Sequence, residues 1–259
     1  RAAAMKPAQR AFTLVELAVA LLVIALLLSG LAVPLAAQVQ LRRQEETLRL
    51  LEEARDALMG FAAANGRLPC PATEASAGQE SFTPAGNAAN GDCAAFYSGY
   101  LPGATLGMAP LDANGFVRDP WLTPRSRLRY AVFGGGASIN GVANPLTRAN
   151  GLQAATLPAL GNASHFLIIC SGGTQATASG CGPATSQLTR RAAFVVFSLG
   201  PNGVNEPAPG SDEARNLDGD AVFVHREPSA AAGREFDDQL LWVPIHLVVN
   251  RLMAAGRLP

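Results

Sequence analysis

The feature that most constrains this chain is an uncharged stretch of 21 residues at positions 17–37. Leu, Ala, Val and Ile make up nearly all of it, and only Ser29, Gly30 and Pro34 interrupt it. As an α-helix this stretch would be about 31 Å long, which matches the hydrocarbon core of a bilayer. A helix buried inside a soluble protein rarely has so long an apolar run. We therefore expect a membrane-spanning helix near the start of the chain.

Charges on either side of the apolar stretch predict its orientation. Three basic residues and no acid lie in the first ten positions (Arg1, Lys6 and Arg10), whereas the two arginines that follow the stretch are offset at once by two glutamates. Basic residues favour the cytoplasmic side of a membrane. The short N-terminal side is therefore expected in the cytoplasm and the bulk of the chain outside it.

Glu16 does not fit a plain membrane anchor. It stands at the head of the apolar run, where burying an ionised carboxylate is costly. An ordinary secretory signal is cleaved after its hydrophobic stretch, at small residues. Here the charged boundary comes before the stretch, in the sequence QRAFTLVEL at residues 9–17.

The sequence AFTLVE at residues 11–16, followed by about twenty apolar residues, resembles the class III leader of type IV pilins and type II secretion pseudopilins. In that family a membrane peptidase cuts on the cytoplasmic side, immediately before the phenylalanine, and N-methylates the new terminus. The resemblance implies cleavage between Ala11 and Phe12 and methylation of Phe12. The family usually has glycine before the cut, where this chain has Ala11. The resemblance also implies an assembly role for Glu16, whose carboxylate would neutralise the N-terminal amine of a neighbouring subunit.

The helix is expected to continue beyond the membrane. Leu48, Leu51, Leu58 and Phe61 recur at helical spacing, and Asn65-Gly66 supplies a stop signal. The predicted organisation is a basic leader at 1–11, a transmembrane helix at 12–37, an amphipathic helix at 38–66 and a disulfide-containing periplasmic or extracellular globular head at 67–259.

From residue 67 onward, short runs rich in β-branched and aromatic residues alternate with turn residues. The predicted fold class is α+β: a pilin-like lollipop whose long N-terminal helix packs on an antiparallel β-sheet head. Strands are predicted at 129–133, 165–170, 192–198, 221–225 and 240–243, a long loop at 76–92 and a short C-terminal helix at 246–255.

The chain has four cysteines, Cys70, Cys93, Cys170 and Cys181. An even number outside the cytoplasm indicates disulfides, with three possible connectivities. Local pairing of the first with the second and the third with the fourth is favoured, because each bond would close a glycine-rich loop. A metal site is the rival interpretation, but the chain has no CxxC and no zinc-module spacing.

Sequence motifs for catalysis are sparse. The three histidines lie in or beside apolar runs, no HExxH or GxSxG occurs, and the only lysine, Lys6, cannot belong to a P-loop. We therefore expect no enzymatic activity and no required cofactor. The formal net charge is zero, which argues against a nucleic-acid partner.

Calcium is the one metal that the sequence suggests. Residues 216–220 and Glu227 mimic EF-hand oxygen spacing, but Ala221 stands where the sharp turn requires glycine. Major pseudopilins bind calcium in a loop near the C-terminus, and by that resemblance four acids would serve such a loop. The alternative is ordinary turn chemistry, in which aspartate is common for backbone reasons. The four candidate ligands are Asp218, Asp220, Asp237 and Asp238.

The resemblance implies a structural subunit of a type IV pilus or a type II secretion pseudopilus. A minor subunit is favoured over a major one because the predicted head is bulky. The implied partners are other pilin or pseudopilin subunits, the prepilin peptidase and the inner-membrane assembly platform. The implied location is the bacterial inner membrane, single-pass with the head in the periplasm, and then a periplasmic or surface filament. The alternatives are an adhesin or substrate-binding tip pilin and, disfavoured by the sparse chemistry, a membrane-anchored periplasmic enzyme.

Overall fold

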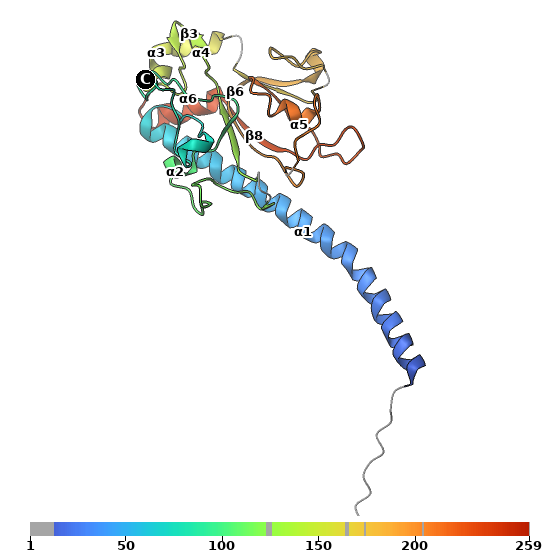
Figure 1. Ribbon diagram of the computed structural model, residues 1–259. Helices are drawn as coiled ribbons and strands as arrows, with labels where there is room; N and C mark the ends of the chain where they lie inside the picture. The colour runs from blue at the N-terminus through green and yellow to red at the C-terminus, as the bar shows by residue number, and fades with distance from the viewer. Residues whose placement is uncertain (1–12, 123–125, 164–165, 174, 204, 259) are drawn as a thin grey trace, which may run out of the picture. The chain divides into compact units, whose positions relative to one another are not determined.

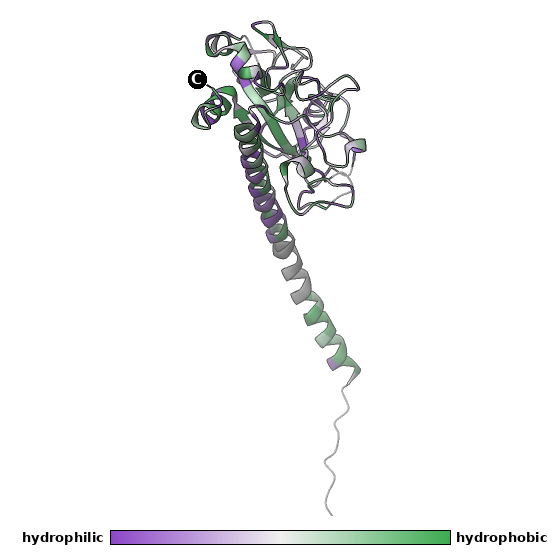
Figure 2. Ribbon diagram, turned by 90° about the vertical axis from the view of Figure 1, so that its left-hand side faces the viewer, coloured by the Kyte–Doolittle hydropathy of each residue, from purple (hydrophilic) through white to green (hydrophobic). Residues whose placement is uncertain are grey.

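The computed structural model describes residues 13–122, 126–163, 166–173, 175–203 and 205–258, with the side chains of 27–36 excepted. The chain divides into two compact units, Arg1–Glu45 and Glu46–Pro259. Helix α1 (Leu14–Asn65) begins in the first unit and ends in the second. It is continuous, as the residue spacing predicted. Figure 2 shows hydrophobic residues over the first turns of α1 and mostly hydrophilic ones on the visible side of its later turns.

In the second unit, α1 buries a narrow stripe. Leu51, Ala54, Leu58 and Ala62 are 0% exposed, and their spacing places them on one face of the helix. Leu48 was expected on this face, but 52% of it is exposed because it lies at the margin of the stripe.

The end of α1 is fixed by contacts with the chain around it. Gly66 has a φ of +68° and its N–H donates to the carbonyl of Ala62 at 2.8 Å, a common glycine stop. Arg257, near the other end of the chain, donates to the carbonyls of Ala63 and Ala64. These are carbonyls that a helix leaves without an internal partner, so the C-terminal segment completes the cap.

The second unit contains a six-stranded sheet with the order β1-β2-β6-β5-β7, in which β8 also pairs with β6. All neighbouring pairs are antiparallel except β5 and β7, which are parallel. The sequence predicted a wholly antiparallel sheet, which is wrong at this pair. After β6 a long connection brings the chain back to the end of the sheet where β5 begins, so β7 runs beside β5 in the same direction. The strands are β1 (Gly99–Tyr100), β2 (Arg129–Val132), β5 (Leu167–Cys170), β6 (Gln187–Ser198), β7 (Val222–Val224) and β8 (Gln239–Pro244).

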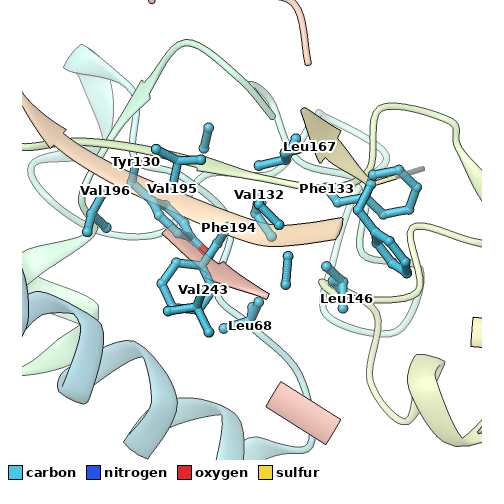
Figure 3. Packing of buried hydrophobic residues seen from close by; sticks show 14 of the residues in the cluster. Leu68, Tyr130, Val132, Phe133, Leu146, Leu167, Phe194, Val195, Val196 and Val243 are labelled. Carbon is cyan, nitrogen blue, oxygen red and sulfur yellow. The ribbon is translucent and has the colours of Figure 1, made fainter. Parts of the chain in front are cut away.

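Strand β6 organises the sheet because it is the longest strand. Its C-terminal half pairs with β2 on one side and β8 on the other, and its N-terminal half pairs with β5. Figure 3 shows Tyr130, Phe194 and Val243 from these strands packed near Leu68. All four are buried, so this face of the sheet forms part of the core that also contains the buried stripe of α1.

Smaller elements connect the strands. Ser138–Ile139 and Val142–Ala143 form the two-stranded hairpin β3–β4, whose turn residues Asn140 and Gly141 both have positive φ. Helix α6 (Ile245–Ala254) follows β8 directly, close to the predicted C-terminal helix. The remaining elements are η1 (Glu74–Ser76), α2 (Gly103–Leu106), α3 (Gly151–Ala155), α4 (Leu157–Asn162), η2 (Ala184–Ser186) and α5 (Asp212–Arg215).

Two disulfides close loops in the second unit. Cys70 is bonded to Cys93 and Cys170 to Cys181, and all four residues are buried. The local pairing favoured from the sequence is the one that forms.

A buried ion pair fixes the first disulfide loop to the end of α1. The guanidinium of Arg67 donates two hydrogen bonds of 2.7 Å to the carboxylate of Glu80. Its planar group also lies over the rings of Phe61 and Phe82, at 5.2 and 5.8 Å. Glu80 accepts a further bond from the N–H of Cys70 at 3.2 Å, so one carboxylate binds both Arg67 and Cys70 in the segment that follows α1.

Candidate functional site

The start of α1 forms a reciprocal hydrogen-bonded cap. The N–H of Thr13 donates to Glu16 Oε2 at 3.0 Å, and the Thr13 hydroxyl donates to the same oxygen at 2.9 Å. In return, the N–H of Glu16 donates to the Thr13 hydroxyl at 3.2 Å. This is a capping box, in which Thr at the N-cap and Glu three residues later satisfy each other's main-chain donors. The sequence T-L-V-E contains this signal, which the sequence analysis did not identify.

The capping box gives Glu16 a second role besides the assembly role that the resemblance implies. A carboxylate in the first turn is stabilised by the N-terminal end of the helix dipole. Glu16 is exposed, so its carboxylate remains accessible to a cation from outside the chain. The cleavage residues Ala11 and Phe12 lie outside the described residues.

The first turns of α1 have no apolar cover within the described part of the chain. Leu14, Val15 and Leu17 are 87%, 71% and 54% exposed, and the apolar residues that follow, up to Leu26, are similarly exposed. Residue 12 and the side chains of 27–36, which belong to the predicted transmembrane helix, lie outside the described part. Among the residues that could be searched, no helix meets the length and apolarity of a membrane crossing.

Comparison with known families gives a match at this same end of the chain. Residues 6–32 match the model of the prokaryotic N-terminal methylation motif. The chain carries the hallmark of type IV pilins and pseudopilins. Proteins with this motif are typically structural subunits rather than enzymes. No curated protein and no solved structure matches the chain.

A second group of functional candidates lies in the larger unit. Carboxylate oxygens of Glu213, Asp237 and Asp238 come within 4.8 Å of one another. Asn202 connects two of these residues: its side-chain amide donates to both oxygens of Glu213 at 2.9 and 3.0 Å, and its N–H donates to Asp237 Oδ2 at 3.2 Å. Asn216 donates to Asp238 at 2.7 Å.

The protonation of this cluster reflects its burial. Burial and the neighbouring carboxylate of Glu213 raise the pKa of Asp237 to about 7. Burial also raises the pKa of Asp238 well above its ordinary value, although the bond from Asn216 opposes the shift. None of the three acids forms an ion pair with a basic residue in the described part of the chain. A cavity of about 370 Å³ adjoins Glu213 and Asp238.

The structure therefore divides the four predicted calcium ligands. Asp237 and Asp238 lie together with Glu213, whereas Asp218 and Asp220 both pair with Arg215, at 2.7 and 3.2 Å. Sequence reasoning missed Glu213 because it precedes Asp237 by more than twenty residues. Its only local signal was Ser211, the N-cap of α5, which accepts a bond from the N–H of Ala214.

The histidines do not converge with these acids in the described residues. The ring of His225 packs edge-on against Trp242 at 5.1 Å, and burial lowers its pKa. His246 lines a small cavity of about 260 Å³ beside α4 and α6. His165 lies outside the described residues.

Proposed function

We propose that this chain is a minor structural subunit of a type IV pilus or a type II secretion pseudopilus. The observation that carries the proposal is the methylation motif at residues 6–32, which ends within the apolar part of α1. The folded unit with its two disulfides suits an oxidising compartment outside the cytoplasm. The proposed route is insertion in the inner membrane through residues 12–37, cleavage between Ala11 and Phe12, methylation of Phe12 and assembly with other subunits.

The exposed apolar turns of α1 support assembly as the purpose of this helix. Apolar surface of this extent requires cover, from lipid in the separate subunit and from other helices in a filament. Glu16 is the one acid in the first turn, and in the proposed filament it accepts the N-terminal amine of a neighbour. The partners in this proposal are the other filament subunits, the prepilin peptidase and the membrane platform.

Mass spectrometry of the N-terminus of membrane-extracted protein tests this proposal. The expected species begins at methylated Phe12. Cells that lack the prepilin peptidase are the control, and there the leader should remain attached. An intact leader in wild-type cells, or a cut after residue 37, would contradict the proposal.

Calcium binding is a separate proposal, now based on Asp237 and Asp238 with Glu213 as a third carboxylate. These groups have the hard oxygen ligands that calcium prefers. Thermal unfolding of the full chain with calcium, compared with magnesium and with chelator, tests it. A rise in melting temperature that calcium alone produces, and that Glu213→Gln abolishes, is the expected result.

A further inference from the structure

The six-stranded sheet ends in three edges, at β1, β7 and β8. An edge strand presents unpaired main-chain N–H and C=O groups, which can pair with another chain. Two of the three edges are closed by neighbouring parts of this protein. The third, β8, has a described partner only in β6.

At β1, the closing segment pairs as a strand would. Ala72 and Tyr100 exchange two main-chain hydrogen bonds of 2.8 Å.

At β7, side chains bind the outward main-chain groups that a neighbouring strand would otherwise bind. Asn216 accepts from the N–H of Val224 at 2.7 Å and donates to its carbonyl at 3.2 Å. Asp220 accepts from the N–H of Val222 at 2.8 Å.

The register identifies which groups of β8 point outward. The N–H of Phe133 donates to the carbonyl of Ala193, so alternate residues of β6 from Ala193 onward direct their main chain toward β2. The residues between them direct theirs toward β8, where Phe194 is opposite Val243 and Val196 opposite Leu241. The main-chain N–H and C=O of Leu240 and Trp242 therefore point away from β6. No described residue pairs with them.

Strand β8 also lacks the devices that usually protect an edge. Charges, bulges and internal prolines are the common ones, and the irregularity in the β6–β8 ladder lies in β6, between Ala192 and Phe194, opposite the end of β8. The strand reads Gln-Leu-Leu-Trp-Val before Pro244, which ends it, and it contains no charge. The start of β6, which pairs with β5, is a contrast because it carries Arg190 and Arg191.

We propose that the edge of β8 receives an extended, largely apolar strand from a subunit of the same assembly that is a different protein from this chain. Main-chain groups at Leu240 and Trp242 are two residues apart, about 6.8 Å, which is the repeat of an antiparallel partner strand. Leu241 and Trp242 are half-buried and lie on opposite faces of β8, so each offers apolar contact to an added strand on its own face; the Trp242 ring also packs on His225. Because the edge carries no charge, an uncharged strand fits it. Addition of a strand to an exposed sheet edge is a recurring recognition mode.

The inference rests on the proposed function, since the partner is another subunit. The test places a photo-crosslinking amino acid at Gln239 of the full chain in the native host. A crosslinker at Leu188, on the arginine-protected stretch of β6, is the control. Crosslinked peptides are identified by mass spectrometry, with leader cleavage measured in the same cells.

Two variants separate the main chain from the side chain. Trp242→Pro removes the outward N–H without removing a bond to β6, whereas Trp242→Ala keeps the N–H and removes the indole. We expect crosslinking from position 239 to an extended segment of a different subunit, a loss of about tenfold or more in Trp242→Pro and substantial retention in Trp242→Ala. Both variants must form both disulfides; if Trp242→Pro does not, Leu240→Pro and Leu240→Ala replace the pair.

Four outcomes would overturn the inference: no crosslink, a crosslink to a second copy of this chain, a crosslink to a helix, or equal crosslinking in the proline and alanine variants. If the leader is cleaved and the subunit assembles without the crosslink, only the strand inference fails. If the leader remains uncleaved, the proposed function fails as well.

Discussion

Single carboxylates in this chain have roles that their neighbours determine. Glu16 is exposed and bonded to Thr13, whereas Asp237 and Asp238 lie with Glu213 and without a basic partner in the described residues. The first is available to a cation from outside. The pKa values of Asp237 and Asp238 are raised, so these two side chains hold protons more tightly than free aspartate does.

For Asp237, the pKa is about 7 in the folded chain and near 3.8 when unfolded. Between these values the folded protein retains a proton that the unfolded chain releases, so the free energy of unfolding falls as pH rises from about 4 to about 7. Asp237→Asn should flatten this dependence and stabilise the protein at pH 8 by on the order of 1 kcal/mol, allowing for solvent screening. Urea unfolding of the full chain in chelator, at several pH values, measures it. Stability that rises over this window would contradict the prediction.

Two substitutions at Glu16 separate its charge from its cap. Glu16→Gln retains an oxygen that accepts from Thr13, as glutamine does in other capping boxes, but it removes the charge. Glu16→Ala removes both. If Glu16 pairs with an amine during assembly, both variants should insert and be cleaved normally yet lose incorporation into filaments. Crosslinking to other subunits, with membrane fractionation as control, is the measurement. Normal incorporation of Glu16→Gln into filaments would show that incorporation depends on the hydrogen bonds of the cap and not on the charge of Glu16.

Among the elements, the first disulfide loop is fixed to the end of α1 by a buried ion pair. Arg67 and Glu80 have side-chain exposures of 8% and 18%, so water compensates little for the loss of either partner. Arg67→Ala should lower the free energy of unfolding by about 3–5 kcal/mol, because it leaves the Glu80 carboxylate buried without its cation.

A double-mutant cycle with Glu80→Gln tests this explanation. If the stranded charge dominates, adding Glu80→Gln to Arg67→Ala should recover part of the lost stability. The exposed pair Arg49 and Glu53 on α1 is the control, and its removal should cost about 0.5 kcal/mol or less. Equal costs at the two pairs would refute the role assigned to burial.

On the scale of the whole molecule, unit Glu46–Pro259 contains the complete sheet, both disulfides and the buried stripe of α1. We expect this unit to fold alone as a soluble domain with a single cooperative unfolding transition. Its native, unreduced form should show no thiol reactive to alkylation. Aggregation of a refolded fragment with scrambled disulfides would show that the first unit contributes to folding.

Much of the sheet was predicted from local pattern, and the misses have local causes. Predicted strands at 129–133, 221–225 and 240–243 agree with β2, β7 and β8 within a residue. Strand β6 begins at Gln187, five residues before the prediction, because its first residues are polar and become a strand only by pairing with β5. The two-residue strands β1, β3 and β4 were too short to leave a pattern.

The sequence by itself determined features that depend on residues close together in the chain, namely the apolar start of α1 and the methylation motif, and it favoured the two local disulfides among three possible connectivities. Only the tertiary structure decided which distant groups meet. It brought Glu213 to Asp237 and Asp238, placed Arg67 on Glu80, set β7 parallel to β5, and gave β8 one partner strand, β6, among the described residues. Periodicity reports which face of a segment is apolar, whereas the choice among possible partners depends on how the whole chain closes around its core.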